Sequence, residues 1–440
     1  MNASRRDDAL AIWHAAVAAV TPAALLARPL MDWQPLGSGR LLVVGGGKAG
    51  AGMATALERL RPDLLHRLAG SLNVPEGFAE TTAKIALNAV RPAGTNTPTE
   101  AAVRGSASMV ELLASAGPDD EAICLLSGGG SALLPLPVVG VPLEAKLDVT
   151  KMLHGCGASI GEMNAVRKHL SRLKGGRLAE GFRGRRMTTF IISDVIGDPL
   201  DVIASGPTAP DPTTFADAIG VLERHRLWND APPEVRRHLE RGRDGLEAET
   251  PKSLPDSVVN RIIGNNAVAL AAAVHRAEGL GYATFDLGTI LDGEAADMAR
   301  RFAGVVRGHR SNAPCCLIAG GETTVSLGPK PGRGGRNQEF VLALWHELAD
   351  VRDTVTILSA GTDGEDGPTD TAGAIADART ADANLDPQPH LERHDSYGFF
   401  DRAGGLIRSG LTGTNVMDVV AVLIAQKINA TFLPAKQHGL

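Results

Sequence analysis

A lysine that follows three consecutive glycines is the first place in the sequence where a chemical role is indicated. The run Leu41 to Val44 is short and apolar, as in a strand covered on both faces, and apolar residues recur at helical spacing after the glycines. Gly45, Gly46 and Gly47 are therefore predicted to turn from a strand into a helix, with free backbone N–H groups and the positive end of the helix dipole at the turn. Because Lys48 adds a full positive charge there, we expect an anion to bind.

Neither standard nucleotide motif fits this turn. The glycines match the dinucleotide fingerprint G-x-G-x-x-G, but that fingerprint also needs an acidic residue at the end of the next strand, where it binds the ribose. The next strand-like segment, Ala69 to Val74, is followed by no carboxylate before Glu76. A Walker A loop needs Ser or Thr after its lysine, and Ala49 follows Lys48. We therefore expect an anion site that belongs to neither of these two motifs. The alternative is a tight turn whose lysine faces solvent.

A second glycine loop follows the next buried strand, Glu121 to Leu126. In a parallel sheet the carboxyl ends of the strands share one edge, where open α/β sheets bind their ligands. We therefore expect this second loop to lie beside the first. Its predicted binding residues are Ser127, Gly128, Gly129, Gly130 and Ser131.

Two carboxylates, Asp194 and Asp198, follow the predicted strand Thr188 to Ser193. Acids at the carboxyl end of a strand, among glycines, suit a magnesium ion or a general base. The alternative is that they cap the next helix.

A strongly basic segment, residues 164–177, precedes these acids. It begins at Asn164 and contains Arg167 and Lys168, which are candidates for binding an anion. A solvated helix face is the alternative explanation for each of these charges.

Glycine-rich loops recur in the second half of the chain, and each contains a candidate site residue. These loops are 320–324 with Glu322, 332–339 with Arg336, 361–367 with Asp363, and 410–418 with Thr412, Thr414 and Asn415. Asn415 is expected to cap a helix whose N-terminus can take an anion.

The composition describes a soluble globular protein, with 44% hydrophobic and 21% charged residues. A net charge of −6 argues against a nucleic-acid surface, and no uninterrupted apolar run is long enough for a membrane span. Asp7 and Asp8 make the apolar stretch Ala9 to Val20 a poor signal peptide. The four cysteines form no C-x-x-C pair, which favours the reducing cytoplasm.

The length of 440 residues predicts two or three domains, and alternating strand and helix patterns predict an α/β fold. The composition changes at Pro210 to Pro255, which is rich in proline, arginine and glutamate. We place a boundary in this segment, giving a first domain, 1–240, that is Rossmann-like with a mainly parallel sheet, and a second α/β domain, 241–440. Because neither domain contains a full set of motifs, the active site is expected in the cleft between them.

Eight ordered motifs, taken together, resemble the class II glycerate 2-kinases. They are GGGKA at 45–49, SGGGSALL at 127–134, N-x-VRKHLS-x-LKGGRLA at 164–179, ISDVIGDP with IASGPTAPD at 192–211, AGGETTV at 319–325, GRGGRNQEF at 332–340, AGTDGEDGPTDTAGA at 360–374 and TGTNVMD at 412–418. The resemblance implies an α/β sandwich peculiar to the family as the second domain. It also implies transfer of the γ-phosphoryl group of ATP, with Mg²⁺, to the 2-hydroxyl of D-glycerate, giving 2-phosphoglycerate and ADP.

One segment departs from the family pattern. Where the family has a Gly-His-Pro-x-Pro-Asp run, this chain has Gly94 to Thr99 without the histidine and the aspartate. A kinase for a related hydroxy acid therefore stays open. A hydroxypyruvate reductase that uses NADH or NADPH also stays open, as does a binding module without catalysis.

Phosphoryl transfer demands positioning and neutralisation of charge, which glycine loops, cations and a metal ion supply. We predict Lys48, Arg336 and Asp194 as catalytic residues. The predicted partners are D-glycerate and ATP, and no nucleic acid or membrane is expected to bind. A homodimer is left open. The predicted metal ligands are Asp194, Asp198, Glu322 and Asp363. The predicted substrate- and phosphate-binding residues are Gly45, Gly46, Gly47, Ser127, Gly128, Gly129, Gly130, Ser131, Asn164, Arg167, Lys168, Thr412, Thr414 and Asn415.

Overall fold

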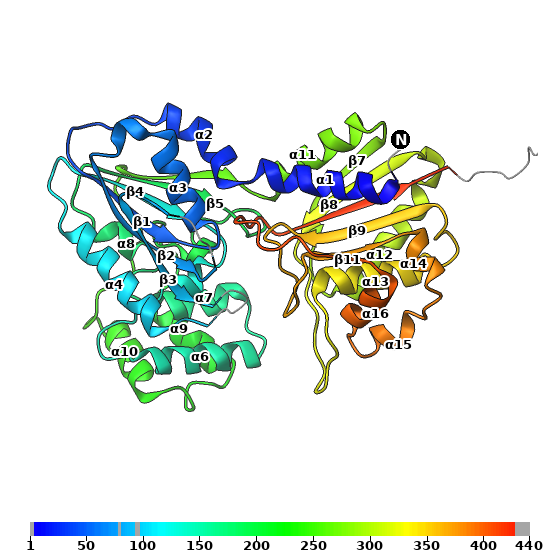
Figure 1. Ribbon diagram of the computed structural model, residues 1–440. Coiled ribbons are helices and arrows are strands. Elements are labelled where there is room, and N and C mark those ends of the chain that lie inside the picture. The colour runs from blue at the N-terminus through cyan, green and yellow to red at the C-terminus, as the bar shows by residue number, and fades with distance from the viewer. Residues whose placement is uncertain (1–3, 78–80, 93–96, 427–440) are drawn as a thin grey trace, which may run out of the picture. The chain divides into compact units, whose positions relative to one another are not determined.

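The computed structural model describes residues 4–77, 81–92 and 97–426, and over these residues it contains two units, each built on a six-stranded sheet (Figure 1). The parallel-sheet unit comprises Val17–Ala269 and Leu411–Met417. The mixed-sheet unit comprises residues 4–16, 270–410 and 418–426. The predicted α/β fold with two sheets is confirmed, whereas the predicted domain limits, 1–240 and 241–440, stay a prediction.

The first sheet has the strand order β3-β2-β1-β4-β5-β6, and every neighbouring pair is parallel. Its strands are β1 (Leu41–Gly46), β2 (Leu68–Pro75), β3 (Ile85–Arg91), β4 (Glu121–Leu126), β5 (Arg186–Ile192) and β6 (Val258–Gly264). The central strands β1 and β4 are buried along their whole length, as the sequence predicts for strands covered on both faces. The loops after β1 and β4 therefore share the carboxyl edge of the sheet.

Helices of the parallel-sheet unit cover its sheet or form a separate apolar cluster. They are α2 (Pro22–Asp32), α3 (Gly50–Leu60), α4 (Glu100–Ala114), α5 (Gly130–Leu133), α6 (Leu143–Gly155), α7 (Ile160–His169), α8 (Arg177–Glu180), α9 (Phe215–Arg224) and α10 (Pro233–Arg243), with 3₁₀ turns at Pro62–Leu64 and Ile203–Ser205. Helices α6, α7, α9 and α10 pack on one another around their own core. A capping box at Ser159 fixes the start of α7.

The second sheet has the order β11-β10-β9-β12-β8-β7 and is mixed, because only the pair β7–β8 is parallel. Its strands are β7 (Ala283–Leu291), β8 (Cys315–Gly321), β9 (Val355–Gly361), β10 (Gly373–Ala376), β11 (Leu406–Ile407) and β12 (Asp418–Ile424). Helices α12 (Ala295–Gly308), α13 (Arg336–Glu347), α14 (Ala378–Asp382), α15 (Gln388–Leu391) and α16 (Ser396–Ala403), and the 3₁₀ turn Arg310–Asn312, belong to this unit. The remaining helices, α1 (Arg5–Ala19) and α11 (Asn266–Gly279), each have residues in both units.

The predicted helix after Asn415 is wrong, because the chain forms strand β12 there. After Asp418, the residues of β12 are apolar and largely β-branched, and the whole strand is buried between β8 and β9. Such residues fit a covered central strand better than a helix.

Among the described residues, one stretch, Arg5–Asp32, is long and apolar enough to cross a membrane by length and composition, with a hydropathy of 1.8. It consists of α1 and α2, and 44% of its most apolar window is buried in the structure. Helices in the cores of soluble proteins pass the same test.

Candidate active site

The turn after β1 has the strand, glycine turn and helix that the sequence predicts, since β1 ends at Gly46 and α3 begins at Gly50. Two of its glycines are required by the neighbouring chain. A Cβ atom on Gly45 would lie 2.0 Å from the carbonyl oxygen of Leu125, and one on Gly47 would lie 2.1 Å from Ser127 Oγ. Close packing against β4 and the loop after it therefore explains these glycines without a ligand.

The backbone donors of this turn are already used within the protein, so the prediction that they are free is wrong. The N–H group of Gly47 donates to Asn73 O over 3.4 Å, and that of Lys48 donates to Gly128 O over 2.8 Å. The N–H group of Ala49 donates to Ser127 Oγ over 3.0 Å. These bonds join the turn to the second glycine loop, so the predicted anion site at this turn now depends on the charge of Lys48.

The second glycine loop, residues 127–131, is called the serine–glycine loop below. The N–H groups of Gly128 and Gly129 donate no hydrogen bond to any described residue. A Cβ atom on Gly129 would lie 3.4 Å from Lys48 Cγ, so the lysine side chain runs alongside this loop. The structure therefore brings two unused backbone donors and a lysine together, which is a suitable arrangement for an anion.

Asp194 and Asn415 contact the same loop. A Cβ atom on Gly128 would lie 2.3 Å from Asp194 Oδ2 and 2.5 Å from Asn415 Nδ2. The Asn415 amide donates to Asp194 Oδ2 over 3.1 Å. Asn415 therefore orients the carboxylate of Asp194, and it caps no helix.

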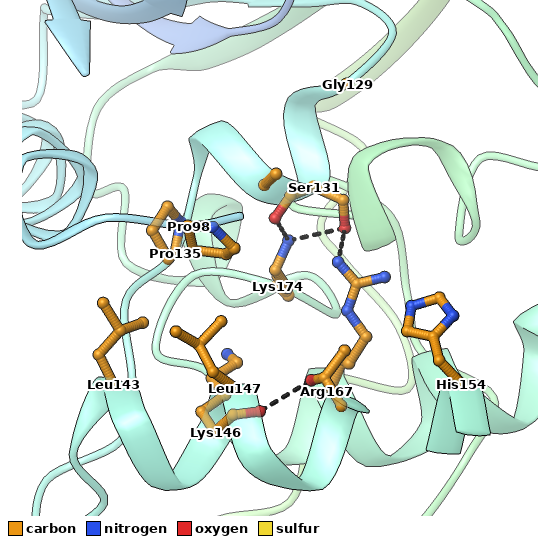
Figure 2. A pocket seen from close by; sticks show the side chains of 12 residues that line it. Pro98, Gly129, Ser131, Pro135, Leu143, Lys146, Leu147, His154, Arg167 and Lys174 are labelled. Carbon is orange, nitrogen blue, oxygen red and sulfur yellow. Dashed lines mark hydrogen bonds between the residues drawn. The ribbon is translucent and has the colours of Figure 1, made fainter. Parts of the chain in front are cut away.

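A pocket of about 240 Å³ adjoins the serine–glycine loop (Figure 2). Its polar walls include Ser131 and three basic side chains, Lys146, Arg167 and Lys174, and none of the described residues that line it is an aspartate or a glutamate. Lys146 donates to the carbonyl oxygen of Leu170 over 3.0 Å. Its other lining residues are Pro98, Gly129, Ala132, Pro135, Leu143, Leu147, Thr150 and His154.

Burial of these cations changes their acid–base behaviour. Burial, with the nearby charge of Arg167, lowers the pKa of Lys146 to about 7. Burial also lowers the pKa of Lys174 well below its usual value, and that of Arg167 to about 10. These lowered pKa values reflect burial and the lack, among the described residues, of a carboxylate that would balance the protonated side chains.

Ser131 lies at the centre of this arrangement. Its Oγ accepts hydrogen bonds from Arg167 Nη2 and from Lys174 Nζ, the latter over 3.1 Å (Figure 2). It also lies 2.6 Å from Ser205 Oγ, which donates to Asn164 Oδ1 over 3.0 Å. The predicted residue Asn164 therefore contacts Ser131 only indirectly, through the hydroxyl of Ser205.

Lys146 and Lys174 are pocket residues that sequence reasoning did not single out. Lys174 lies in the basic segment that was noted for its charge. Lys146 lies on the buried face of α6 with Leu143, Val149 and Leu153. A lysine in the apolar stripe of an amphipathic helix is the signal that could have identified it.

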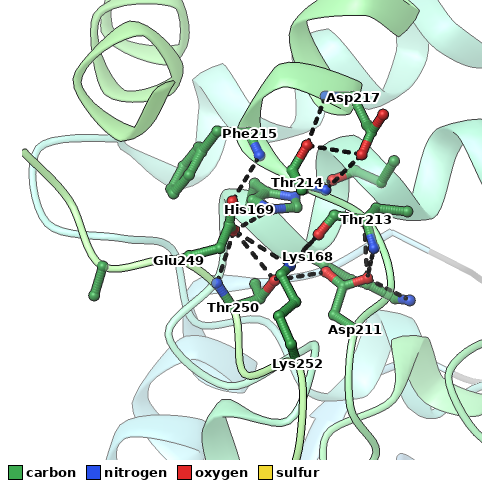
Figure 3. A network of polar contacts seen from close by, with 12 residues as sticks. Lys168, His169, Asp211, Thr213, Thr214, Phe215, Asp217, Glu249, Thr250 and Lys252 are labelled. Atoms are coloured by element: carbon green, nitrogen blue, oxygen red, sulfur yellow. Dashed lines mark hydrogen bonds and ion pairs between the residues drawn. The ribbon is translucent and has the colours of Figure 1, made fainter. Parts of the chain in front are cut away.

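Lys168 does not line the pocket, although it follows Arg167 directly. Lys168 is 1% exposed, and its ammonium group lies 3.2 Å from the carboxylates of both Asp201 and Asp211. Adjacent residues of a helix face different directions, and this one belongs to a separate polar network (Figure 3). Its predicted role in binding substrate stays a prediction.

Two further predicted residues have structural partners. Asp198 accepts a hydrogen bond from Asn265 Nδ2 over 2.6 Å. Thr414 is buried, and its hydroxyl donates to the carbonyl oxygen of Val20 over 2.5 Å. These contacts hold the loops that carry them.

Arg336, in the mixed-sheet unit, is held by two carboxylates. Its Nε and Nη2 donate to Asp418 over 2.6 and 2.9 Å, and its Nη1 lies 2.6 Å from Glu322 Oε1. Burial acts to lower the pKa of Arg336, but the carboxylate of Asp418 outweighs it and raises that pKa well above its usual value. Glu322, a predicted metal ligand, therefore contacts a cation here.

Asp366 fixes the start of α13, whose first residue is Arg336. Its carboxylate accepts the backbone N–H groups of Asn337 and Gln338, each over 2.9 Å. Complete burial raises the pKa of Asp366 to about 6. Sequence reasoning missed this residue, which joins two glycine-rich motifs and places Arg336.

The structure brings no three potential metal-ligating residues together within the described ranges. Asp363 is buried, and its Oδ1 accepts the N–H group of Glu365 over 3.0 Å. Asp194 remains a half-buried carboxylate beside the serine–glycine loop. Magnesium commonly takes only one or two protein carboxylates together with substrate phosphates, and the carboxylate of Asp194 has the chemistry of such a ligand.

Two family models match the chain. A domain of unknown function, DUF4147, matches residues 8–240, and the MOFRL family matches residues 315–418.

Several similar proteins match nearly the whole chain. Glycerate 2-kinase of Pyrococcus horikoshii is 38% identical over 89% of this chain and 89% of its own length. A protein of Agrobacterium vitis that carries the provisional name hydroxypyruvate reductase is 39% identical over 96% of this chain and 95% of its own. The crystal structure of glycerate kinase from Thermotoga maritima is similar with a TM-score of 0.82 and 35% identity, covering 96% of this chain and 99% of that one.

Proposed function

This chain belongs to the glycerate kinase family, and from that premise we propose that it transfers the γ-phosphoryl group of ATP to the 2-hydroxyl of D-glycerate, giving 2-phosphoglycerate and ADP. The observation that carries the proposal is the serine–glycine loop. Two unused backbone donors lie there between a lysine and a carboxylate, next to a cationic pocket. Phosphoryl transfer needs this combination of positioning and charge neutralisation.

We assign roles to three residues. Lys48 neutralises charge on the transferring phosphoryl group, while the N–H groups of the serine–glycine loop bind its oxygens. Asp194, held by Asn415, accepts the proton of the substrate hydroxyl or contacts the metal ion. Arg336 is proposed to stabilise the same charge, with Asp418 fixing the plane of its guanidinium. The predicted cleft that would bring Lys48 and Arg336 to one phosphoryl group stays a prediction.

ATP and Mg²⁺ are the proposed cofactors. A magnesium ion bound with ATP would neutralise negative charge on the phosphates. Asp194 is the proposed ligand, with Asp198 behind it, and Glu322 and Asp363 are secondary candidates. A cytoplasmic location also stays a proposal, and it is supported by the four cysteines, which are all free and of which three are buried. A homodimer stays a proposal as well.

A hydroxypyruvate reductase is the alternative, and one relative carries that provisional name. Its sequence support is the G-x-G-x-x-G match at the turn after β1. In the structure, packing against β4 explains two of these glycines, and three N–H groups of the turn are bonded within the protein. These observations remove the argument for a dinucleotide at this turn.

A coupled assay tests the proposal. Purified protein with D-glycerate, ATP and magnesium should release ADP, and phosphorus NMR should identify the 2-phosphate. Oxidation of NADH or NADPH by hydroxypyruvate, without ADP release from D-glycerate, would instead establish the reductase. Other 2-hydroxy acids should be tested beside D-glycerate because of the altered segment Gly94 to Thr99, whose first three residues lie outside the described residues.

A further inference from the structure

The pocket beside the serine–glycine loop concentrates positive charge without a counter-ion. Lys146 and Lys174 are only 6% and 1% exposed. Among the described residues, neither of them nor Arg167 forms an ion pair with a carboxylate. Burying unpaired charge is costly, so the protein retains these cations at the expense of stability. An anionic ligand would balance them.

The hydrogen bonds show which cations can receive that ligand. Lys174 uses its three donors on Ser131 O, Ser131 Oγ and Ala204 O, at 2.9, 3.1 and 3.3 Å. Within the described part of the chain, Lys146 makes one bond, to Leu170 O, and Arg167 makes one, to Ser131 Oγ. An ammonium group has three donors and a guanidinium has five. Lys146 and Arg167 therefore keep donors for a ligand, whereas Lys174 holds the loop.

The size and the walls of the pocket restrict the ligand. Its volume of about 240 Å³ lies below the range of ~300–1,000 Å³ for drug-sized ligands. Leu143, Leu147 and Pro135 contribute apolar side chains to the lining of the same pocket (Figure 2). A nucleotide is too large for this space, whereas an acid of three or four carbons fits.

We infer that this pocket binds the carboxylate of the acceptor hydroxy acid, with Arg167 and Lys146 as its direct partners. The inference rests on the proposed function. A guanidinium matches a carboxylate in two parallel hydrogen bonds, and Lys146 supplies a second charge. Because Gly129 and Ser131 line the same pocket, a short acid held there has its hydroxyl near the serine–glycine loop and Lys48. The pocket therefore selects acids over neutral polyols.

Charge-removing variants test this assignment. Lys146→Met and Arg167→Gln should each raise the KM for D-glycerate, and its Kd measured by calorimetry without ATP, by roughly 10–100-fold, as for loss of a charged hydrogen bond. The KM for ATP should stay unchanged. Lys151→Met is the matched control, since Lys151 is an exposed lysine of the same helix α6. Thermal unfolding of each variant confirms that it is folded.

Competition separates a carboxylate site from a phosphate site. D-Glycerate, inorganic phosphate, ADP and glycerol are titrated into each protein. Loss of D-glycerate binding alone in the two variants supports the inference. Unchanged D-glycerate binding overturns it, and so does a selective loss of phosphate or ADP binding.

The outcomes for the wild-type protein keep the two proposals apart. If it phosphorylates D-glycerate and the variants do so equally well at low D-glycerate, the inference fails and the proposed function stands. If it phosphorylates no D-glycerate, the proposed function fails. In that case, the pocket assignment is still supported if the wild-type protein binds a carboxylate and Lys146→Met abolishes this binding. The pocket assignment is overturned if no such binding is found.

Discussion

Replacing Lys146 by methionine should make the protein more stable while weakening its binding of an acid. The pKa of this lysine falls from 10.5 to about 7 because it is buried. Each pKa unit corresponds to about 1.4 kcal/mol, so near pH 7 the folded protein retains Lys146 at a cost on the order of 4 kcal/mol. Methionine has a similar length and suits the apolar neighbours Leu143 and Leu147.

The variant also loses a hydrogen bond, which sets the net effect. The carbonyl oxygen of Leu170 loses its bond to Lys146, which costs about 1 kcal/mol. The expected net stabilisation is therefore on the order of 3 kcal/mol at pH 7. For a unit of this size that corresponds to a rise in Tm of roughly 6–12 °C.

The pH dependence identifies the cause. Between the folded pKa near 7 and the unfolded value of 10.5, unfolding of the wild type takes up a proton at Lys146, so its stability rises with pH in this window. The advantage of Lys146→Met should therefore shrink toward pH 10.5. Calorimetric unfolding at several pH values measures it, with Lys151→Met as the control. A lower Tm for Lys146→Met at pH 7, or an advantage independent of pH, would refute the reasoning.

Three further outcomes are expected. Lys48→Ala and Arg336→Ala should each lower turnover by ~10²–10⁴-fold in folded protein, since each removes a charge that is proposed to face the transition state; near-normal turnover contradicts the assigned role. Exhaustive chelation should abolish activity and added Mg²⁺ should restore it, whereas full activity without a divalent ion would exclude the metal. The Kd for D-glycerate should rise as the pH increases above about 7, because Lys146 loses its proton there. A flat pH profile of the wild-type Kd in calorimetry, or a steep profile that Lys146→Met retains, would contradict this role of Lys146.

Much of the fold follows from local patterns. The apolar runs of β1 and β4 predicted buried parallel strands, and the glycines after them predicted loops at one edge of the sheet. The segment after Asn415 was mispredicted because a cap-like residue before apolar residues also precedes a buried strand. Its pairing with β8 and β9, which are distant in sequence, decides the outcome.

The candidate site was predictable in residue type but not in contacts. Arg167 and Lys168 are equivalent in the sequence, yet one lines the pocket and the other pairs with Asp201 and Asp211. Only the packing of α7 distinguishes them. Likewise, no local pattern shows that the donors of the β1 turn are bonded to the serine–glycine loop, because those bonds join separate strands.

The hydroxyl of Ser131 has a fixed hydrogen-bond polarity. Ser205 donates its single hydrogen to Asn164, so in the short contact between the two serines Ser131 must be the donor. Both lone pairs of Ser131 Oγ are meanwhile occupied by Arg167 and Lys174. The oxygen has no capacity left to attack a phosphorus atom or to accept a proton. Ser131 therefore acts as a fixed acceptor that orients the side chains of Arg167 and Lys174. Any reaction at this edge of the sheet must use other groups.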